Sequence, residues 1–216
     1  RFLKSSAIMA GGAITTQVEV SPAAFAVITS FPASVSALRA SRPGMKKALK
    51  YGMIQMEGNV LDKFKLIKEL GFDGVEPNSP SALDRSEVLQ ARDATGIEIP
   101  GVVDSVHWRQ TLSDPDPEVR DAGRRGLETA IRDCKFYGGT SVLLVPAVVK
   151  KGVSYDDAYR RSQEEIRKIL PLAEDLGIQI AFENVWNQFL LSPLEAAQYV
   201  DEFESPMVGW HFDVGN

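Results

Sequence analysis

The chain of 216 residues has 44% hydrophobic residues, enough to bury one substantial core. Its 24 Lys and Arg against 29 Asp and Glu give a net charge of −5, which disfavours a nucleic-acid partner because phosphate binding needs a clustered basic face. No run of about 20 apolar residues occurs, so we expect no membrane span. The single cysteine, Cys134, excludes an internal disulfide, and its helical surroundings predict a small core residue.

The first 26 residues are typical of a targeting segment. A basic start, Arg1-Phe2-Leu3-Lys4, precedes a weakly apolar run, and a candidate cleavage site follows at Ala24-Phe25-Ala26. This segment resembles the end of a twin-arginine export signal, although only one Arg is visible. We therefore predict a periplasmic or exported protein, with a disordered leader on a cytoplasmic protein as the alternative. Residues 27–48 are rich in Ser, Ala, Pro and Arg without a period, which predicts a linker.

From residue 49 onward, short apolar runs alternate with amphipathic segments. The runs predict strands at 51–56, 74–76, 98–104, 141–145, 178–183 and 208–213. The amphipathic segments predict helices at 60–70, 81–95, 117–137 and 154–176, and a helix of about one dozen residues after Ser192-Pro193. Ser at the N-cap and Pro at the first position mark the start of that last helix. Several of the helices end at a Gly directly before the next strand, which is a common C-terminal signal.

Alternating βα units of about 30 residues predict an α/β fold with a parallel sheet, either an eightfold barrel or an open doubly wound sheet. The open sheet usually carries a Gly-rich phosphate turn after its first strand, and Met56-Glu57-Gly58-Asn59 offers none. Polar residues instead end four strands, namely Glu76, His107, Glu183 and Asp213. A (β/α)8 TIM barrel over residues 49–216 is therefore expected, truncated after its sixth strand because only six strands can be counted.

The strongest functional signal is the pair Glu183 and Asp213, each at the end of a predicted strand. Their strands are one βα unit apart and should be neighbours, so the two carboxylates converge. A divalent cation would relieve their repulsion. Oxygen ligands favour Mg²⁺ or Mn²⁺, and added imidazole widens the choice to Zn²⁺ or Co²⁺. The alternative is that each acid caps a helix or pairs with an Arg.

The sequences F-E-N at 182–184 and H-F-D-V-G-N at 211–216, with Glu76 and S-V-H-W at 105–108, resemble the xylose-isomerase-like TIM barrel superfamily. Within it they are similar to the sugar phosphate isomerase/epimerase group of ketose 3-epimerases, pentulose-phosphate 3-epimerases and hydroxypyruvate isomerases. The resemblance implies that Glu183 and Asp213 bind a divalent metal, with a His and a second Glu beyond Asn216. It also implies that Glu183 removes a proton beside a carbonyl to form an enediolate.

Further residues are candidates for binding a small-molecule sugar. His107 and Glu76 end strands; the alternatives are a structural role at the mouth for His107 and the anchoring of a loop for Glu76. Trp186 and Asn187, with Phe189, follow Glu183 on a loop and can wall a sugar site or simply pack. Asn216 stands where the resemblance places a substrate-contacting His. His211, two residues before Asp213, is expected to be a core histidine rather than a ligand.

The sequence therefore predicts a metal-dependent sugar isomerase or epimerase, with a homo-oligomer possible. Two other classes stay open: a non-catalytic, exported sugar-binding barrel, and a nuclease of the endonuclease IV type. The nuclease needs a cluster of metal-binding histidines, and the chain has two His and an acidic balance. Phosphorylated pentoses occur in the cytoplasm, so export would favour a free sugar or an oxidised glycoside as substrate.

Overall fold

A computed structural model describes residues 44–215. The predicted export signal at 1–26 lies outside the described residues, as does the predicted linker up to residue 43. The elements are β1 (Ala48–Lys50), α1 (Val60–Glu69), β2 (Gly74–Glu76), β3 (Asn78–Ser79), α2 (Arg85–Thr95), β4 (Gly101–Asp104), α3 (Pro117–Tyr137), β5 (Ser141–Leu144), α4 (Tyr155–Leu176), β6 (Gln179–Phe182), α5 (Pro193–Asp201) and β7 (Val208–Trp210). A short 3-10 helix, η3 (Tyr51–Met53), follows β1.

Side-chain caps fix where the helices begin. The Asp116 carboxylate accepts from the Glu118 N–H before α3, and the Ser154 hydroxyl accepts from Asp157 N–H before α4. Ser192 and Glu195 form a reciprocal capping box at the start of α5. These oxygens satisfy N–H groups that have no partner within the helix, which explains why the starts of α3, α4 and α5 could be predicted from sequence.

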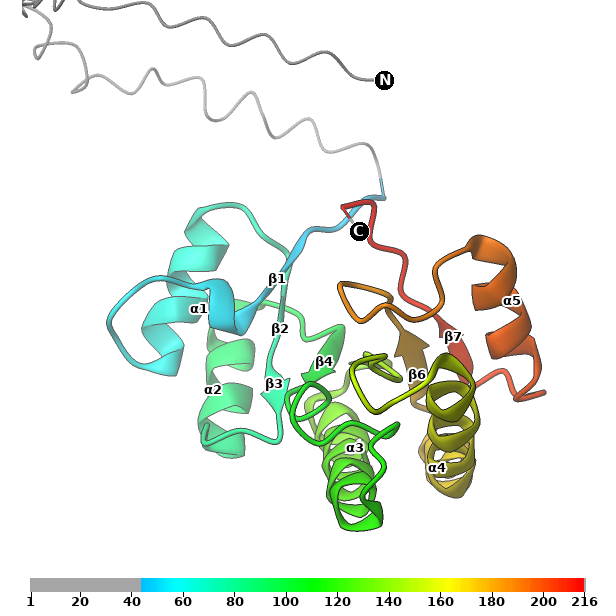
Figure 1. Cartoon of the computed structure of the whole chain (residues 1–216). Helices are drawn as coiled ribbons and strands as arrows, with labels where there is room; N and C mark the ends of the chain where they lie inside the picture. Colours follow the sequence, from blue (N-terminus) through cyan, green and yellow to red (C-terminus); the bar gives the residue numbers. More distant parts are fainter. Residues whose placement is uncertain (1–43, 216) are drawn as a thin grey trace, which may run out of the picture. The chain divides into compact units, whose positions relative to one another are not determined.

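All strand pairs are parallel, as the alternating pattern predicted. β1 pairs with β2, and a five-stranded sheet runs in the order β3-β4-β5-β6-β7. The chain passes from β2 through Pro77 directly into β3, and a bridge between Gly74 and Glu98 also ties β2 to the segment before β4. Figure 1 shows the strands curving as an arc from β1 to β7 with helices α1 to α5 on its outer side. The arc places the carboxyl ends of all these strands along one rim.

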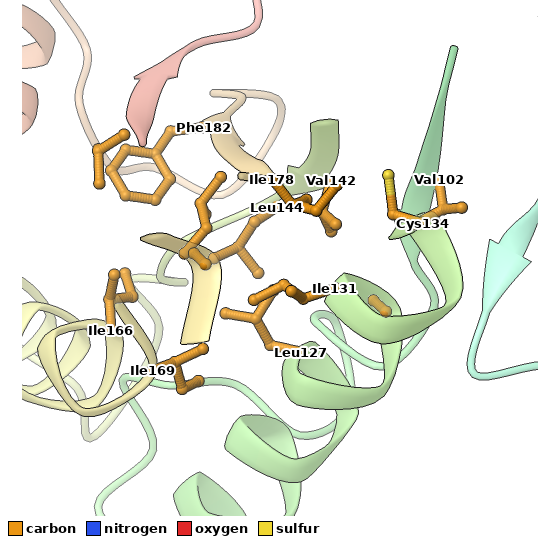
Figure 2. Packing of buried hydrophobic residues seen from close by; sticks show 14 of the residues in the cluster. Val102, Leu127, Ile131, Cys134, Val142, Leu144, Ile166, Ile169, Ile178 and Phe182 are labelled. Atoms are coloured by element: carbon orange, nitrogen blue, oxygen red, sulfur yellow. The ribbon is translucent and has the colours of Figure 1, made fainter. Parts of the chain in front are cut away.

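The core lies between the outer face of the strands and the helices. Side chains alternate along each strand: Val142, Leu144 and Phe182 face the helices and are fully buried. Figure 2 shows Leu127 and Ile131 of α3, with Ile166 and Ile169 of α4, gathered against this face. Cys134 is also fully buried there, as predicted. The intervening residues face the inside of the arc and are 4–8% exposed, namely Val103, Leu143 and Ala181.

Several element boundaries differ from the sequence prediction, among them those of the first strand and the second helix. The first strand is β1 at Ala48–Lys50, and Tyr51–Met53 form the 3-10 helix rather than the strand expected at 51–56. Its position is set by pairing with β2, in which Leu49 lies opposite Val75 and Lys50 opposite Glu76. The second helix, α2, starts only at Arg85, where the Asp84 side chain caps it. None of the described helices combines the length and the apolar character needed to cross a bilayer.

Candidate active site

A cavity of about 290 Å³ opens among the carboxyl ends of the strands. Its wall consists of residues from β1, β3, β4, β5, the loop after β4 and the segment that follows β6, namely Lys50, Asn78, Val103, Asp104, Ser105, His107, Trp108, Leu143, Glu183 and Val185. Of the residues predicted from sequence, it therefore includes Glu183 and His107. Sequence reasoning missed Lys50, Asp104 and Trp108 as members of the site.

Glu183 and Asp213 lie together at this rim, as their spacing predicted. Glu183 follows β6 directly, its N–H bonded to the Leu144 carbonyl at 3.0 Å, and it is only 4% exposed. Burial raises the pKa of Glu183, the nearby charges of Lys50 and His211 lower it, and Asp213 raises it by repulsion and by a hydrogen bond between the two side chains. A carboxyl of raised pKa beside a second carboxyl group can exchange protons with a bound molecule.

His107 is neutral in this environment. It is 6% exposed, and its Nδ1 accepts the Val145 N–H at 3.3 Å, which ties the loop after β4 to the end of β5. Burial lowers the pKa of His107 to about 4, and the positive charge of Lys50 lowers it in the same direction. Trp108 packs edge-on against the imidazole with ring centroids 5.7 Å apart and is 47% exposed. His107 therefore has a structural role and also lines the cavity.

Asp104 ends β4 and is 1% exposed. One of its carboxyl oxygens accepts the Val106 N–H at 3.0 Å. Burial raises the pKa of Asp104 to about 7, although the Val106 hydrogen bond acts in the opposite direction. Asp104 ends a strand as Glu183 does, so the rule that identified Glu183 could have found it. The sequence prediction includes Asp104 only as the last residue of the strand at 98–104.

The loop after Glu183 carries three residues that the sequence predicts as candidates for the wall of a sugar site. Asn187 is 1% exposed, its Oδ1 accepts the Val185 N–H and its Nδ2 donates to the Ala147 carbonyl, each at 2.9 Å. Both polar atoms of the amide thus bond to the backbone and hold the loop in place. The predicted contact of Asn187 with a substrate stays a prediction. Phe189 is fully buried and packs on Tyr155, 5.1 Å between ring centroids. Trp186 is 88% exposed and does not line the cavity, and its predicted contact with a sugar stays a prediction.

The remaining predicted residues fall in three different places. Glu76 ends β2, is half-buried and lies beside Lys50 in register, but it is not part of the cavity wall. His211 is half-exposed, and its charge acts on Glu183, so the expectation of a core histidine was wrong. The reason is that β7 ends at Trp210, which leaves His211 at the rim rather than inside the sheet. Asn216 lies outside the described residues.

Two adjacent carboxylates provide the oxygen ligands that hard divalent cations prefer, and the imidazole of His211 near Glu183 is a borderline ligand. The donor chemistry of Glu183 and Asp213 therefore fits a divalent metal. Within residues 44–215, however, no three His, Cys, Asp or Glu side chains converge as a metal site. The described part of the chain thus brings together two candidate ligands.

Several proteins of known identity resemble this chain. It is 25% identical over 167 residues to an L-ribulose-5-phosphate 3-epimerase of Escherichia coli O1:K1, covering 72% of this chain and 59% of that protein. A crystal structure of D-psicose 3-epimerase in the presence of D-fructose shares its fold with a TM-score of 0.62 at 21% identity, covering 76% of this chain and 62% of the other. The IOLI protein with a bound zinc atom gives a TM-score of 0.63 at 16% identity, covering 77% and 62%.

The chain thus spans 59% of the length of the curated relative that it matches. The profile of the family described as xylose isomerase-like TIM barrel matches residues 64–216, which include every strand of the arc after β1 and both rim carboxylates. The chain belongs to the xylose isomerase-like TIM barrel family.

Proposed function

We propose that this protein is a sugar isomerase or epimerase that moves a proton at the carbon beside a carbonyl. The observation that carries the proposal is the position of Glu183, a buried carboxyl of raised pKa on the wall of a cavity at the carboxyl ends of parallel strands. The relatives named as sugar epimerases support the same class of reaction.

Glu183 is the base in this proposal. Its carboxylate takes the proton from the C–H next to the substrate carbonyl, and the electron pair of that bond moves toward the carbonyl oxygen to give an enediolate. Return of the proton from Glu183 to the neighbouring carbon, together with transfer of the hydroxyl proton to the former carbonyl oxygen, isomerises the sugar. Delivery of a proton by a second acid to the opposite face of the original carbon epimerises it, and Glu183 keeps the proton that it took. A carboxyl whose pKa lies above its usual range is a better acceptor for this weakly acidic proton.

Glu183 and Asp213 would also hold a divalent cation, Mn²⁺, Mg²⁺, Zn²⁺ or Co²⁺, which when bound polarises the carbonyl and the adjacent hydroxyl of the sugar. Trp108 and His107 form the adjoining wall, where an exposed indole face suits the C–H groups of a sugar ring. The substrate class includes free ketoses, their phosphates and oxidised glycosides.

Hydrogen exchange tests this proposal directly. The protein is incubated in D₂O with Mn²⁺ and with D-fructose, L-ribulose 5-phosphate or an oxidised glycoside, and loss of the C–H signal is followed by proton NMR. We expect exchange with at least one sugar and its loss in Glu183→Gln, while Glu164→Gln, an exposed carboxylate on α4, should behave as the unaltered protein. Sugar binding without exchange would refute the enzyme and indicate a non-catalytic binding protein.

Metal binding is measured separately, without reference to turnover. Mn²⁺ titrated into the protein and followed by electron paramagnetic resonance should show a bound population that weakens in both Glu183→Gln and Asp213→Asn. The Glu164→Gln control should bind as the unaltered protein does. Equal binding by all four proteins would refute the assignment of these two ligands.

A further inference from the structure

Lys50 is the one Lys or Arg side chain on the cavity wall formed by residues 44–215. It is the last residue of β1, paired in register with Glu76 at the end of β2, and it is half-buried. Its charge reaches two different walls of the site, because it acts on Glu183 after β6 and on His107 after β4. The ammonium group of Lys50 is therefore close enough to interact electrostatically with Glu183, the proposed base.

Lys50 is not held in an ion pair by any other described residue. Lys50 takes part in none of the ion pairs formed within residues 44–215. The lysines nearby along the chain differ in this respect, since Lys46 pairs with Glu98 at 2.5 Å and Lys47 lies over the Phe72 ring at 5.7 Å. The half-buried position of Lys50 on the cavity wall, outside any ion pair of the described residues, leaves the ammonium group available to a bound molecule.

The proposed reaction gives the positive charge of Lys50 a role. When Glu183 takes the proton from carbon, the carboxylate becomes neutral, and the electron pair of the C–H bond forms the new C–C double bond. The carbonyl π pair moves onto oxygen, so one negative charge passes from Glu183 to the substrate. A fixed cation acting on the site where charge develops lowers the barrier without any reorganisation at the moment of reaction.

We propose that Lys50 is a catalytic residue that binds the substrate oxygen on which this negative charge develops. The inference rests on the proposed function and adds to it the group that stabilises the enediolate from the β1 side of the cavity. Lys50 contributes only its positive charge and leaves the proton balance unchanged: Glu183 takes the proton from carbon, and Glu183 (isomerisation) or an acid on the opposite face (epimerisation) gives a proton back to carbon. Substrates that lack an oxygen at that position would lose turnover.

The test compares Lys50→Met, Lys50→Arg and Lys50→Ala in the same hydrogen-exchange assay, with Lys151→Met in an exposed turn as the matched control. Removing one preorganised electrostatic group costs roughly 100-fold in kcat, so we expect a loss of that order in Lys50→Met with KM within about threefold. Lys50→Arg should retain a large part of the activity, and ethylammonium in the buffer should restore part of it to Lys50→Ala. Circular dichroism checks that each variant is folded.

The other outcomes each decide the matter. Unchanged kcat in Lys50→Met, or a rise in KM alone, would overturn the inference and leave the proposed function standing. A loss restored neither by Lys50→Arg nor by ethylammonium would also overturn it, because packing rather than charge would then be responsible. Absence of exchange in the unaltered protein would overturn both this inference and the proposed function.

Discussion

Replacing Asp104 by Asn should make the stability of this protein much less dependent on pH. Asp104 is 1% exposed, and burial raises its pKa from 3.8 to about 7. The Asn side chain has nearly the same shape, can still accept the Val106 N–H through its carbonyl oxygen, and carries no charge to bury. The comparison therefore isolates the cost of ionising this one carboxyl inside the fold.

The sign follows from proton linkage. Between the unfolded and folded pKa values the folded state holds a proton that the unfolded state has lost, so stability falls as pH rises from about 4 to about 7 and then levels off. At 1.36 kcal/mol per pKa unit, the full shift from 3.8 to about 7 amounts to about 4 kcal/mol above pH 7. About 3 kcal/mol of this difference develops between pH 5 and pH 8.5.

Urea unfolding of both proteins at pH 5 and at pH 8.5 measures the effect. The free energy of unfolding of Asp104→Asn, minus that of the unaltered protein, should be about 3 kcal/mol larger at pH 8.5 than at pH 5. Ala in place of an exposed carboxylate, Glu118→Ala, provides the control and should leave the pH dependence unchanged. Parallel stability curves for the Asp104→Asn and unaltered proteins would refute the raised pKa.

Three further substitutions test the packing around the site. Gly123→Ala should lower the free energy of unfolding by about 1–3 kcal/mol, because the added Cβ would lie inside contact distance of the Gln110 carbonyl oxygen; an unchanged urea midpoint would contradict this. Asn187→Ala should cost about 3 kcal/mol by leaving one buried and one part-buried backbone group without partners, and limited proteolysis should then cut the loop after β6. Tyr199→Phe should cost only about 1 kcal/mol in the same unfolding assay, since the Ser162 hydroxyl, 2.7 Å from the tyrosine oxygen, keeps its second bond to a backbone carbonyl.

Capping residues in the sequence were sufficient to predict where most of the helices start. The starts of α1, α3 and α5 were correct because Asn59, Asp116 and Ser192 cap backbone N–H groups within three residues, which is an interaction that sequence spacing reveals. The start of α2 was placed too early at residue 81, because Ser81 and Asp84 are both acceptable caps and only the structure shows that Asp84 is used. Short strands were less certain, since the position of β1 depends on a neighbour 26 residues away in register.

The sequence by itself determined the fold class, the parallel order of the strands and the convergence of Glu183 with Asp213. These follow from the alternation of elements and from the period of one βα unit, both of which are local properties of the chain. Only the tertiary structure decided what surrounds that pair. Segments distant in sequence bring the charge of Lys50 to Glu183 and bury the carboxyl of Asp104. They also give the Asn187 amide the backbone partner that holds the loop, and these contacts depend on which way a side chain points after its strand ends. Burial and the field of neighbouring charges exist only once those segments meet, and they set the protonation of Glu183, His107 and Asp104.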